Sequence, residues 1–328
     1  MASARSLLKP STGIEKQYLD VLELADGTSI RLPVMIARGA KPGPKLFVDA
    51  AIHGWEIVGT EVIRRVLREE LNLADLEGTV VTVPVANPPA FQVKGYTNPQ
   101  DRADISRAVP GDPKLSQSQR FGARIWSLIK ESNYYINFHC IEGPSLPYIE
   151  VRGPSGSTLD KSLKMAQVFG LPITFADPVL LKYWPPNAVD LAVSSGIPSF
   201  MPELPFPSIF MNEDSVKMGT RGLLNVMKFI GMIPGEIEPQ DTKFSLPSPL
   251  YTNMIAADHG GIVHPACLLG AKVAKGDPVV RILNVFGDEV DVVRSPRDAY
   301  VMSFCLNVNQ VAGTGDFVVM IGWEVSSS

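Results

Sequence analysis

Four residues of the kinds that bind or activate metal ions interrupt three apolar stretches of this 328-residue chain. His53 and Glu56 stand three residues apart just after the first stretch, while His139 and Glu203 stand near the ends of the other two. Two imidazoles and one carboxylate make the ligand set of many catalytic zinc sites, in which water takes the fourth position. The pattern therefore predicts one zinc ion per chain, bound by His53, Glu56 and His139.

Glu203 is left over from this ligand set and suits a different task. A carboxylate that is not bound to metal can take a proton from water and pass it to a leaving group. We therefore predict that Glu203 is the catalytic base and acid. Each signal is weak by itself, since a histidine at a strand end is often a hydrogen-bonded core residue. The four together are more specific, because burying such groups without partners is costly.

The elements that must position these residues follow from the periodicity of the apolar residues. Residues 44–52 and 79–86 are apolar without clear alternation, which is typical of strands buried on both faces. Residues 57–72 between them repeat apolar residues at helical spacing. The alternation continues, with helices predicted at 116–131, 158–170, 188–196 and 213–231 and strands at 134–140 and 197–204. It predicts an α/β fold with a mainly parallel sheet and helices on both faces.

This fold would gather the four residues in one place. In open α/β sheets, ligands bind at the carboxyl ends of the strands, and the four residues are predicted at that end of three strands. If those strands are neighbours, all four side chains project into one crevice. A β-hairpin is predicted before this region, because Asp26 and Gly27 separate two alternating runs.

The C-terminal third of the chain has a different pattern. A proline-rich stretch predicts a linker, and short β-like runs with many glycines follow it. Residues 273–283 and 311–321 share a valine, a Gly-Asp pair and an apolar run, which suggests two related hairpins of a small sandwich or barrel. We therefore predict a catalytic domain over residues 1–235 and an all-β domain over residues 243–328.

Composition indicates which classes of partner and which cellular compartment to expect. The net charge is −4 and the basic residues form no block, which disfavours nucleic acid as a partner. No stretch approaches the roughly 18 uninterrupted apolar residues of a membrane span, and the N-terminus lacks the apolar core of a signal peptide. The three cysteines are widely spaced and odd in number, which fits a reducing compartment. A cytoplasmic protein is the expectation.

The short motifs around these residues resemble those of one family in a fixed order. "IHGWEIVG" resembles the His-Gly-x-Glu-x-x-Gly signature of the succinylglutamate desuccinylase/aspartoacylase family, part of the zinc carboxypeptidase (M14-like) superfamily. The segments "VPVANPPAF", "DISRAVPGD", "NFHC" and "PELP" resemble later family motifs, so the resemblance spans roughly residues 45–321. It implies a zinc carboxypeptidase-like fold and a C-terminal β-domain of biotinyl/lipoyl-like shape.

The resemblance also implies roles for individual residues. It assigns zinc to His53, Glu56 and His139, and it assigns the general base and acid to Glu203. Arg107 takes the place of an arginine that grips a substrate carboxylate, a pairing suited to a bidentate guanidinium.

Departures from the family pattern leave the substrate open. Ser106 stands where the family has asparagine, and Asn137 stands where it has aspartate. The arginine that stabilises an oxyanion has no clear counterpart, so Arg102 and Lys94 both remain candidates. Glu142, three residues after His139, is a candidate to recognise a substrate amino group, although a solvated loop glutamate is an equal alternative.

Together these features predict a zinc-dependent amidohydrolase that deacylates a small N-acyl amino acid or a related compound. The expected partner is a small molecule bearing a carboxylate; neither nucleic acid nor membrane is expected, and a homo-oligomer stays open. One alternative is a metallocarboxypeptidase acting on peptides. Another, of a different class, is a non-catalytic binding or scaffold protein with the same fold.

Overall fold

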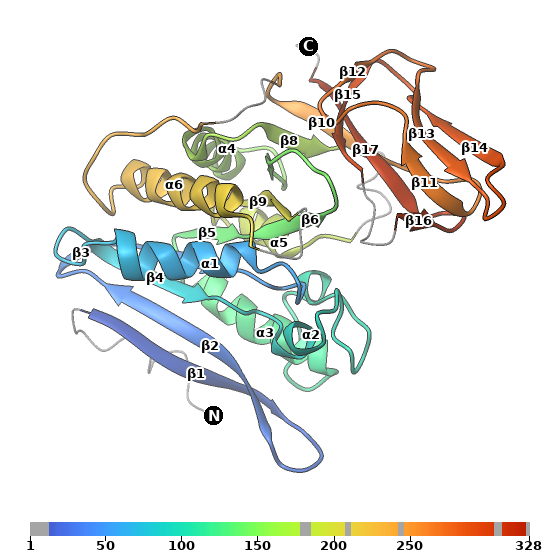
Figure 1. The fold of residues 1–328 in the computed structure, drawn as a ribbon. Helices are drawn as coiled ribbons and strands as arrows, with labels where there is room; N and C mark the ends of the chain where they lie inside the picture. Colours follow the sequence, from blue (N-terminus) through green and yellow to red (C-terminus); the bar gives the residue numbers. More distant parts are fainter. Residues whose placement is uncertain (1–12, 178–184, 207–210, 242–245, 305–309, 326–328) are drawn as a thin grey trace.

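The N-terminal hairpin has the predicted form. The computed structural model describes residues 13–177, 185–206, 211–241, 246–304 and 310–325 (Figure 1). Strands β1 (Gly13–Glu23) and β2 (Ser29–Arg38) pair antiparallel. Gly27 supplies a φ of 83° in the turn, and the amide of Thr28 donates a hydrogen bond to Asp26 Oδ1 at 2.9 Å. A positive φ at this place is why glycine suits the turn.

Parallel strands form the centre of the larger sheet. Strand β3 (Lys41–Asp49) lies between β4 (Glu77–Val83) and β5 (Tyr134–Asn137), and β5 pairs in turn with β9 (Ser199–Phe206). All three pairings are parallel. Leu46, Phe47 and Val48 are consecutive and fully buried, because both faces of the sheet are covered.

The prediction of a mainly parallel sheet was wrong, because the sheet is mixed. β2 adds to β4 in antiparallel fashion, and β9 pairs in parallel with β6 (His139–Glu142) but antiparallel with β7 (Tyr148–Glu150). β8 (Ile173–Ala176) pairs in parallel with β7 and with β10 (Leu250–Ala256). β2 and β4, and likewise β7 and β9, are not consecutive in the chain, so the path of the intervening residues and not a hairpin sets their antiparallel direction.

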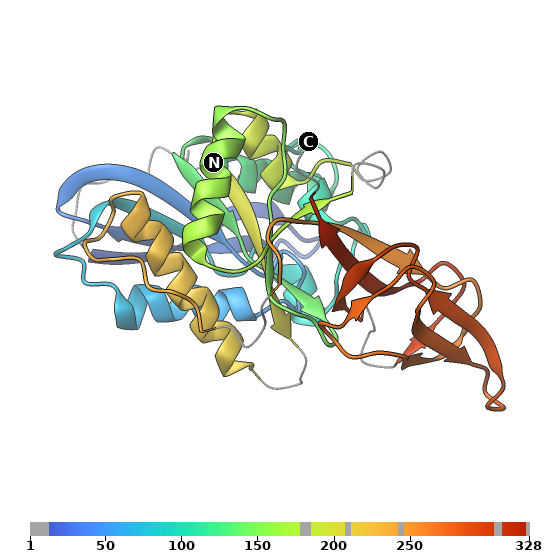
Figure 2. The same ribbon diagram turned by 90° about the horizontal axis from the view of Figure 1, so that it is seen from above.

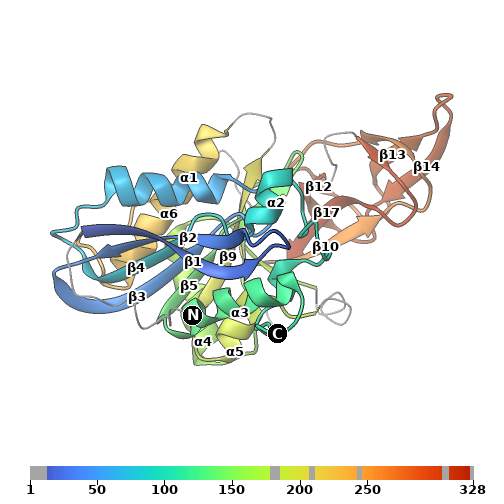
Figure 3. The same ribbon diagram turned by 90° about the horizontal axis from the view of Figure 1, so that it is seen from below.

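Helices cover both faces of this sheet, as predicted. They are α1 (Val58–Arg65), α2 (Pro88–Val93), α3 (Gln117–Lys130), α4 (Ser157–Phe169), α5 (Ala188–Ser194) and α6 (Glu213–Phe229). Helices α1 and α6 lie on one face, and α3 and α5 lie on the other (Figure 3). The helix predicted at 57–72 is regular only as far as Arg65, and a single π-helical turn (Val66–Glu70) ends it. None of the described helices is long and apolar enough to span a bilayer.

The strand predicted at 134–140 is broken at Phe138. Strand β5 ends at Asn137 and β6 begins at His139, so the two segments pair with β9 in different places. Phe138 is fully buried in the core that α1 shares with α6. Gly59 lets α1 approach, since a Cβ there would lie 2.4 Å from the Cβ of Phe138. The register with β9 is the same on both sides of the break, so His139 lies directly opposite Glu203.

The C-terminal strands form two sheets at one end of the molecule (Figure 1, Figure 2). Strands β12 (Lys272–Val273), β15 (Ala299–Ser303) and β17 (Phe317–Glu324) extend the larger sheet beyond β10. A separate antiparallel sheet has the order β14 (Glu289–Arg294), β13 (Pro278–Leu283), β11 (Gly261–Pro265) and β16 (Val311–Ala312). The two similar sequence segments form β12–β13 and β16–β17, and each pair crosses from one sheet to the other.

Candidate active site

Three predicted metal ligands meet in a buried cluster. Nδ1 of His53 lies 2.7 Å from Oε1 of Glu56, and Nδ1 of His139 lies 3.0 Å from the other oxygen, Oε2. One ligand-type atom from each of the three residues lies within 4.8 Å of the others. All three side chains are nearly inaccessible to solvent. Both histidines therefore direct the same ring nitrogen towards one carboxylate.

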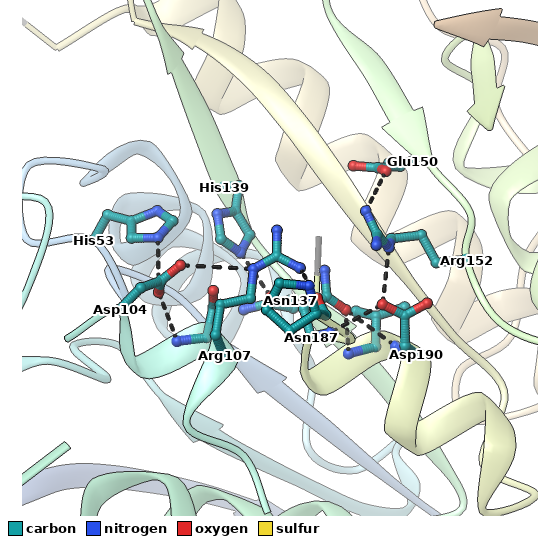
Figure 4. A network of polar contacts seen from close by, with 12 residues as sticks. His53, Asp104, Arg107, Asn137, His139, Glu150, Arg152, Asn187 and Asp190 are labelled. Atoms are coloured by element: carbon teal, nitrogen blue, oxygen red, sulfur yellow. Dashed lines mark hydrogen bonds and ion pairs between the residues drawn. The ribbon is translucent and has the colours of Figure 1, made fainter. Parts of the chain in front are cut away.

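Outer partners hold both imidazole rings in this orientation. Nε2 of His53 lies 3.3 Å from Oδ1 of Asp104, and Nε2 of His139 lies 2.7 Å from Oδ1 of Asn137 (Figure 4). Ligand histidines in metal sites usually donate their second N–H to such oxygens, which fixes the tautomer and frees the other nitrogen. The donor set and its support therefore fit a zinc ion.

The loop that carries His53 and Glu56 is fixed against α2. Asn87 caps α2 by accepting a hydrogen bond from the amide of Ala90, and its Nδ2 donates to the carbonyl of Ile52 at 3.0 Å. Gly54 lets the loop pass very close to the helix, because a Cβ there would lie 2.1 Å from the carbonyl carbon of Ala90. The ligands are thus placed by backbone contacts that a larger residue would break.

The charges around His53 favour its cationic or metal-bound form. Burial lowers the pKa of His53, but the negative charges of Glu56 and Asp104 outweigh burial and raise it to about 10. Burial would raise the pKa of Asp104, but hydrogen bonds from His53 and Ser106 hold it well below its usual range. Asp104 is therefore ionised at neutral pH and can only accept from His53. A divalent cation would take the place of the proton at Nδ1.

Glu203 lies beside the three ligands. The parallel register of β6 and β9 places it opposite His139. Burial and the negative charges of Glu56 and Glu150 raise the pKa of Glu203 well above its usual range. Its Oε2 is buried and makes no hydrogen bond within the described residues. The strand continues to Phe206, so Glu203 lies inside β9 rather than at its end.

These groups line one cavity of about 580 Å³, to which the C-terminal strands also contribute. Its walls include the three ligands and Glu203 on the side of the central sheet. Met254, Val311, Asp316 and Phe317 line it from the C-terminal part of the chain. The C-terminal strands therefore restrict the space above the four residues.

The structure brings only some of the predicted substrate-binding residues to this cavity. Ser106 and Arg107 line it, and the guanidinium of Arg107 donates to the carbonyl of Pro185 and lies 3.8 Å from Asp104. Arg102 is exposed and, like Lys94, lies outside the cavity lining. Glu142 ends β6, and its side chain lies outside the described part of the structure.

Two features of the cavity were missed in the sequence. The ring of Tyr96 stacks on that of His53, with 3.7 Å between their centroids, and no periodic signal marks this loop residue. The second feature is a buried ionic cluster at β7. There was a signal for it, because Glu150 and Arg152 are two residues apart in an otherwise apolar stretch and so share a face.

This ionic cluster carries more negative than positive charge. The buried guanidinium of Arg152 donates from Nη1 to Glu150 and from Nε to Asp190, both at 2.9 Å (Figure 4). Asp190 also accepts a hydrogen bond from the amide of Asn187 and completes the cap of α5. Two carboxylates thus share one guanidinium, and Glu150, Arg152 and Asn187 line the cavity.

Comparisons with known proteins agree with this fold. The chain is 24% identical over 313 residues to an N-alpha-acetyl-L-2,4-diaminobutyric acid deacetylase of Halomonas elongata, covering 91% of this chain and 87% of the relative. The product-bound ectoine utilization protein EutE of Ruegeria pomeroyi has a TM-score of 0.84 at 21% identity, over 95% of this chain and 96% of that one. A succinylglutamate desuccinylase of Silicibacter has a TM-score of 0.80 at 20% identity, over 95% of both chains.

A family model matches more than half of the chain. Residues 42–230 match the succinylglutamate desuccinylase/aspartoacylase catalytic domain, and this range includes all four residues of the site. The chain therefore belongs to the succinylglutamate desuccinylase/aspartoacylase family.

Proposed function

We propose that the protein is a zinc-dependent deacylase of small N-acyl amino acids. The observation that carries this proposal is the convergence of His53, Glu56 and His139 beside the buried carboxyl of Glu203 in one cavity. Such an arrangement combines a metal-ligand set with a separate proton-transferring group. It argues against a non-catalytic scaffold, which would have no need for a buried carboxyl whose Oε2 makes no hydrogen bond to a described residue.

The roles of the side chains follow from their positions. Zinc, when bound by the three ligands, lowers the pKa of water and polarises an acyl carbonyl. Glu203 accepts the proton of the attacking water and delivers it to the departing amine. A raised pKa makes Glu203 a stronger base than an exposed glutamate, and a nearby divalent charge moderates that rise. Arg107 pairs with a carboxylate of the substrate.

The shape of the cavity supports a small substrate over a peptide. Residues from β10, β16 and β17 line the same space as the metal ligands, so the C-terminal strands limit its extent. A cavity of about 580 Å³ is within the range of small-molecule sites. A panel of N-acetyl amino acids and dipeptides, tested with zinc-loaded protein, distinguishes the two activities. Cleavage of the peptides but not of the N-acetyl compounds would reverse the assignment.

Arg107→Ala is expected to lower kcat/KM about 10- to 100-fold for substrates that carry a free carboxylate, since a hydrogen bond to a charged group contributes roughly 1.5–3 kcal/mol. Arg102→Ala is the matched control, because Arg102 belongs to the same loop but lies outside the cavity lining. Steady-state kinetics with an N-acetyl amino acid and its carboxamide are the measurement. An equal fall of kcat/KM for the acid and the carboxamide would show that Arg107 does not bind the substrate carboxylate.

The ionic cluster suggests what else the substrate carries. Glu150 and Asp190 together outweigh the charge of Arg152, and Glu150 lines the cavity, where its carboxylate favours a cationic group. The Halomonas elongata relative is by name a deacetylase of an acetylated diamino acid. We therefore propose an Nα-acyl amino acid with a second, free amino group as the substrate.

Glu150→Gln tests this substrate class directly. Its KM for N-acetyl-2,4-diaminobutyrate is expected to rise about 10-fold, because a hydrogen bond between charged groups contributes roughly 1.5–3 kcal/mol. Its KM for N-acetyl-2-aminobutyrate, which lacks the second amino group, should not rise. Arg152 keeps its ion pair with Asp190 in this variant. If KM rises for both substrates alike, Glu150 supports the wall and does not select the ammonium.

A further inference from the structure

A buried carboxyl beneath the metal ligands has no part in the mechanism described so far. Asp49 is the last residue of β3 and is fully inaccessible to solvent. Burial raises its pKa to about 7, while hydrogen bonds from Asn137 and Tyr135 act in the opposite direction. A carboxyl in such a place is costly unless its hydrogen bonds are satisfied. The partners of Asp49 therefore indicate what it does.

Hydrogen bonds lead from Asp49 to a metal ligand in two steps. Nδ2 of Asn137 donates to Oδ1 of Asp49 at 2.7 Å, and Oδ1 of the same amide lies 2.7 Å from Nε2 of His139. The hydroxyl of Tyr135 completes the site, donating to Asp49 at 3.1–3.2 Å. The parallel register of β3 and β5 sets Asp49 beside Asn137, and His139 follows two residues later.

The direction of each hydrogen bond is fixed by Asp49. Once ionised, its carboxylate can only accept, and the hydrogen bonds from Asn137 and Tyr135 favour that form. The NH₂ group of Asn137 must therefore face Asp49, and its carbonyl oxygen must face His139. His139 then has to donate from Nε2, which leaves the lone pair of Nδ1 for a metal.

We propose that Asp49 is a positioning residue of the metal centre, which acts through the amide of Asn137 to hold His139 in its metal-binding tautomer. This inference rests on the zinc site of the proposed function. His53 is held by the carboxylate of Asp104 directly, whereas His139 is held by a carboxylate one residue further away.

The test moves the carboxylate one step along this chain of hydrogen bonds, from residue 49 to residue 137. Asp49→Asn leaves two amides side by side, so Asn137 is free to turn its NH₂ group towards His139. Its zinc affinity, measured by competition with a chromophoric chelator, is expected to fall about 10- to 100-fold, as for other outer partners of metal ligands. The double variant Asp49→Asn/Asn137→Asp puts a carboxylate against His139 and an amide donor behind it. Its zinc affinity should return to that of the wild type.

Tyr135→Phe is the matched control. It removes one donor to Asp49 but leaves the amide of Asn137 in place, so zinc affinity should not change even if the protein loses stability. A second readout is the Nε2–H signal of His139 in zinc-loaded protein labelled with ¹⁵N-histidine. The chain has only four histidines, so the spectrum can be assigned by substituting them in turn. The signal should persist in wild type and double variant and exchange rapidly in Asp49→Asn.

Each outcome decides between the alternatives. Unchanged zinc affinity in a folded Asp49→Asn protein would overturn the inference and leave the proposed function intact. If Asp49→Asn alone does not fold, the double variant carries the test, and its failure to fold or to bind zinc would equally overturn the inference. A wild-type protein that takes up no zinc would overturn the proposed function together with this inference.

Discussion

Replacing Glu203 with glutamine should reduce kcat about 100- to 10,000-fold while zinc stays bound, because a positioned proton-transferring group contributes about that factor. Glutamine has nearly the same shape but cannot take a proton from water. Glu203 makes no hydrogen bond through Oε2 to any described residue, so the substitution disturbs few contacts. It also removes an acidic group from a buried cluster of like charges, so the folded state should be no less stable. Zinc content and single-turnover rates on an N-acyl amino acid are the measurements.

Glu150→Gln serves as the control for this prediction. It neutralises Glu150, which together with Glu56 raises the pKa of Glu203 and lines the same cavity. Its effect should appear mainly in KM for substrates with a second amino group, whereas Glu203→Gln should act on kcat for every substrate. A Glu203→Gln protein with near-normal kcat would rule out Glu203 as the base.

Removing the metal should abolish hydrolysis and also destabilise the fold. His53, Glu56 and His139 are buried against one another, and one hydrogen bond and one ion pair among them would have to hold the site after chelation. A ligand present at about 1,000 times its Kd adds about 4 kcal/mol to the free energy of unfolding. Zinc should therefore raise the melting temperature as well as restore activity, whereas magnesium, which prefers oxygen ligands, should do neither.

The Glu203→Gln protein separates the loss of hydrolysis from the loss of stability. It should show the same loss of thermal stability on chelation as the wild type, although it has little activity to lose. Substituting Glu56 with glutamine should mimic chelation and make the melting temperature insensitive to added zinc. Full activity in a protein shown by metal analysis to hold almost no metal would disprove the zinc dependence.

Most of the fold was predictable from the periodicity of the apolar residues. The runs around Phe47 and Val81 lack alternation because helices cover both faces of their strands, so they were recognisable as central strands. The mixed character of the sheet was not recognisable, since pairing such as that of β7 with β9 joins residues about 50 positions apart. Strand direction in such pairs depends on the path of the intervening chain, which leaves no local pattern.

The candidate site was predictable in so far as its residues interrupt apolar strands. His139 and Glu203 could be singled out because a polar group in a buried strand needs a partner. The same reasoning applies to Asp49, which stands inside the run at 44–52 and escaped notice because its partners lie on another strand. Arg102 shows the opposite case: the loop around it has no periodicity, and its exposed position could not be deduced.

The pairing of β10 with β8 determines what happens when the chain is divided before β10. Backbone hydrogen bonds continue from β8 through β10 to β17, so one ladder runs from the α/β part into the C-terminal strands. Cutting the chain in the proline-rich stretch before β10 would leave β8 as a bare edge, a known route to aggregation. The same cut would remove one wall of the cavity. The protected edge of β8 and one wall of the cavity therefore both depend on the C-terminal strands.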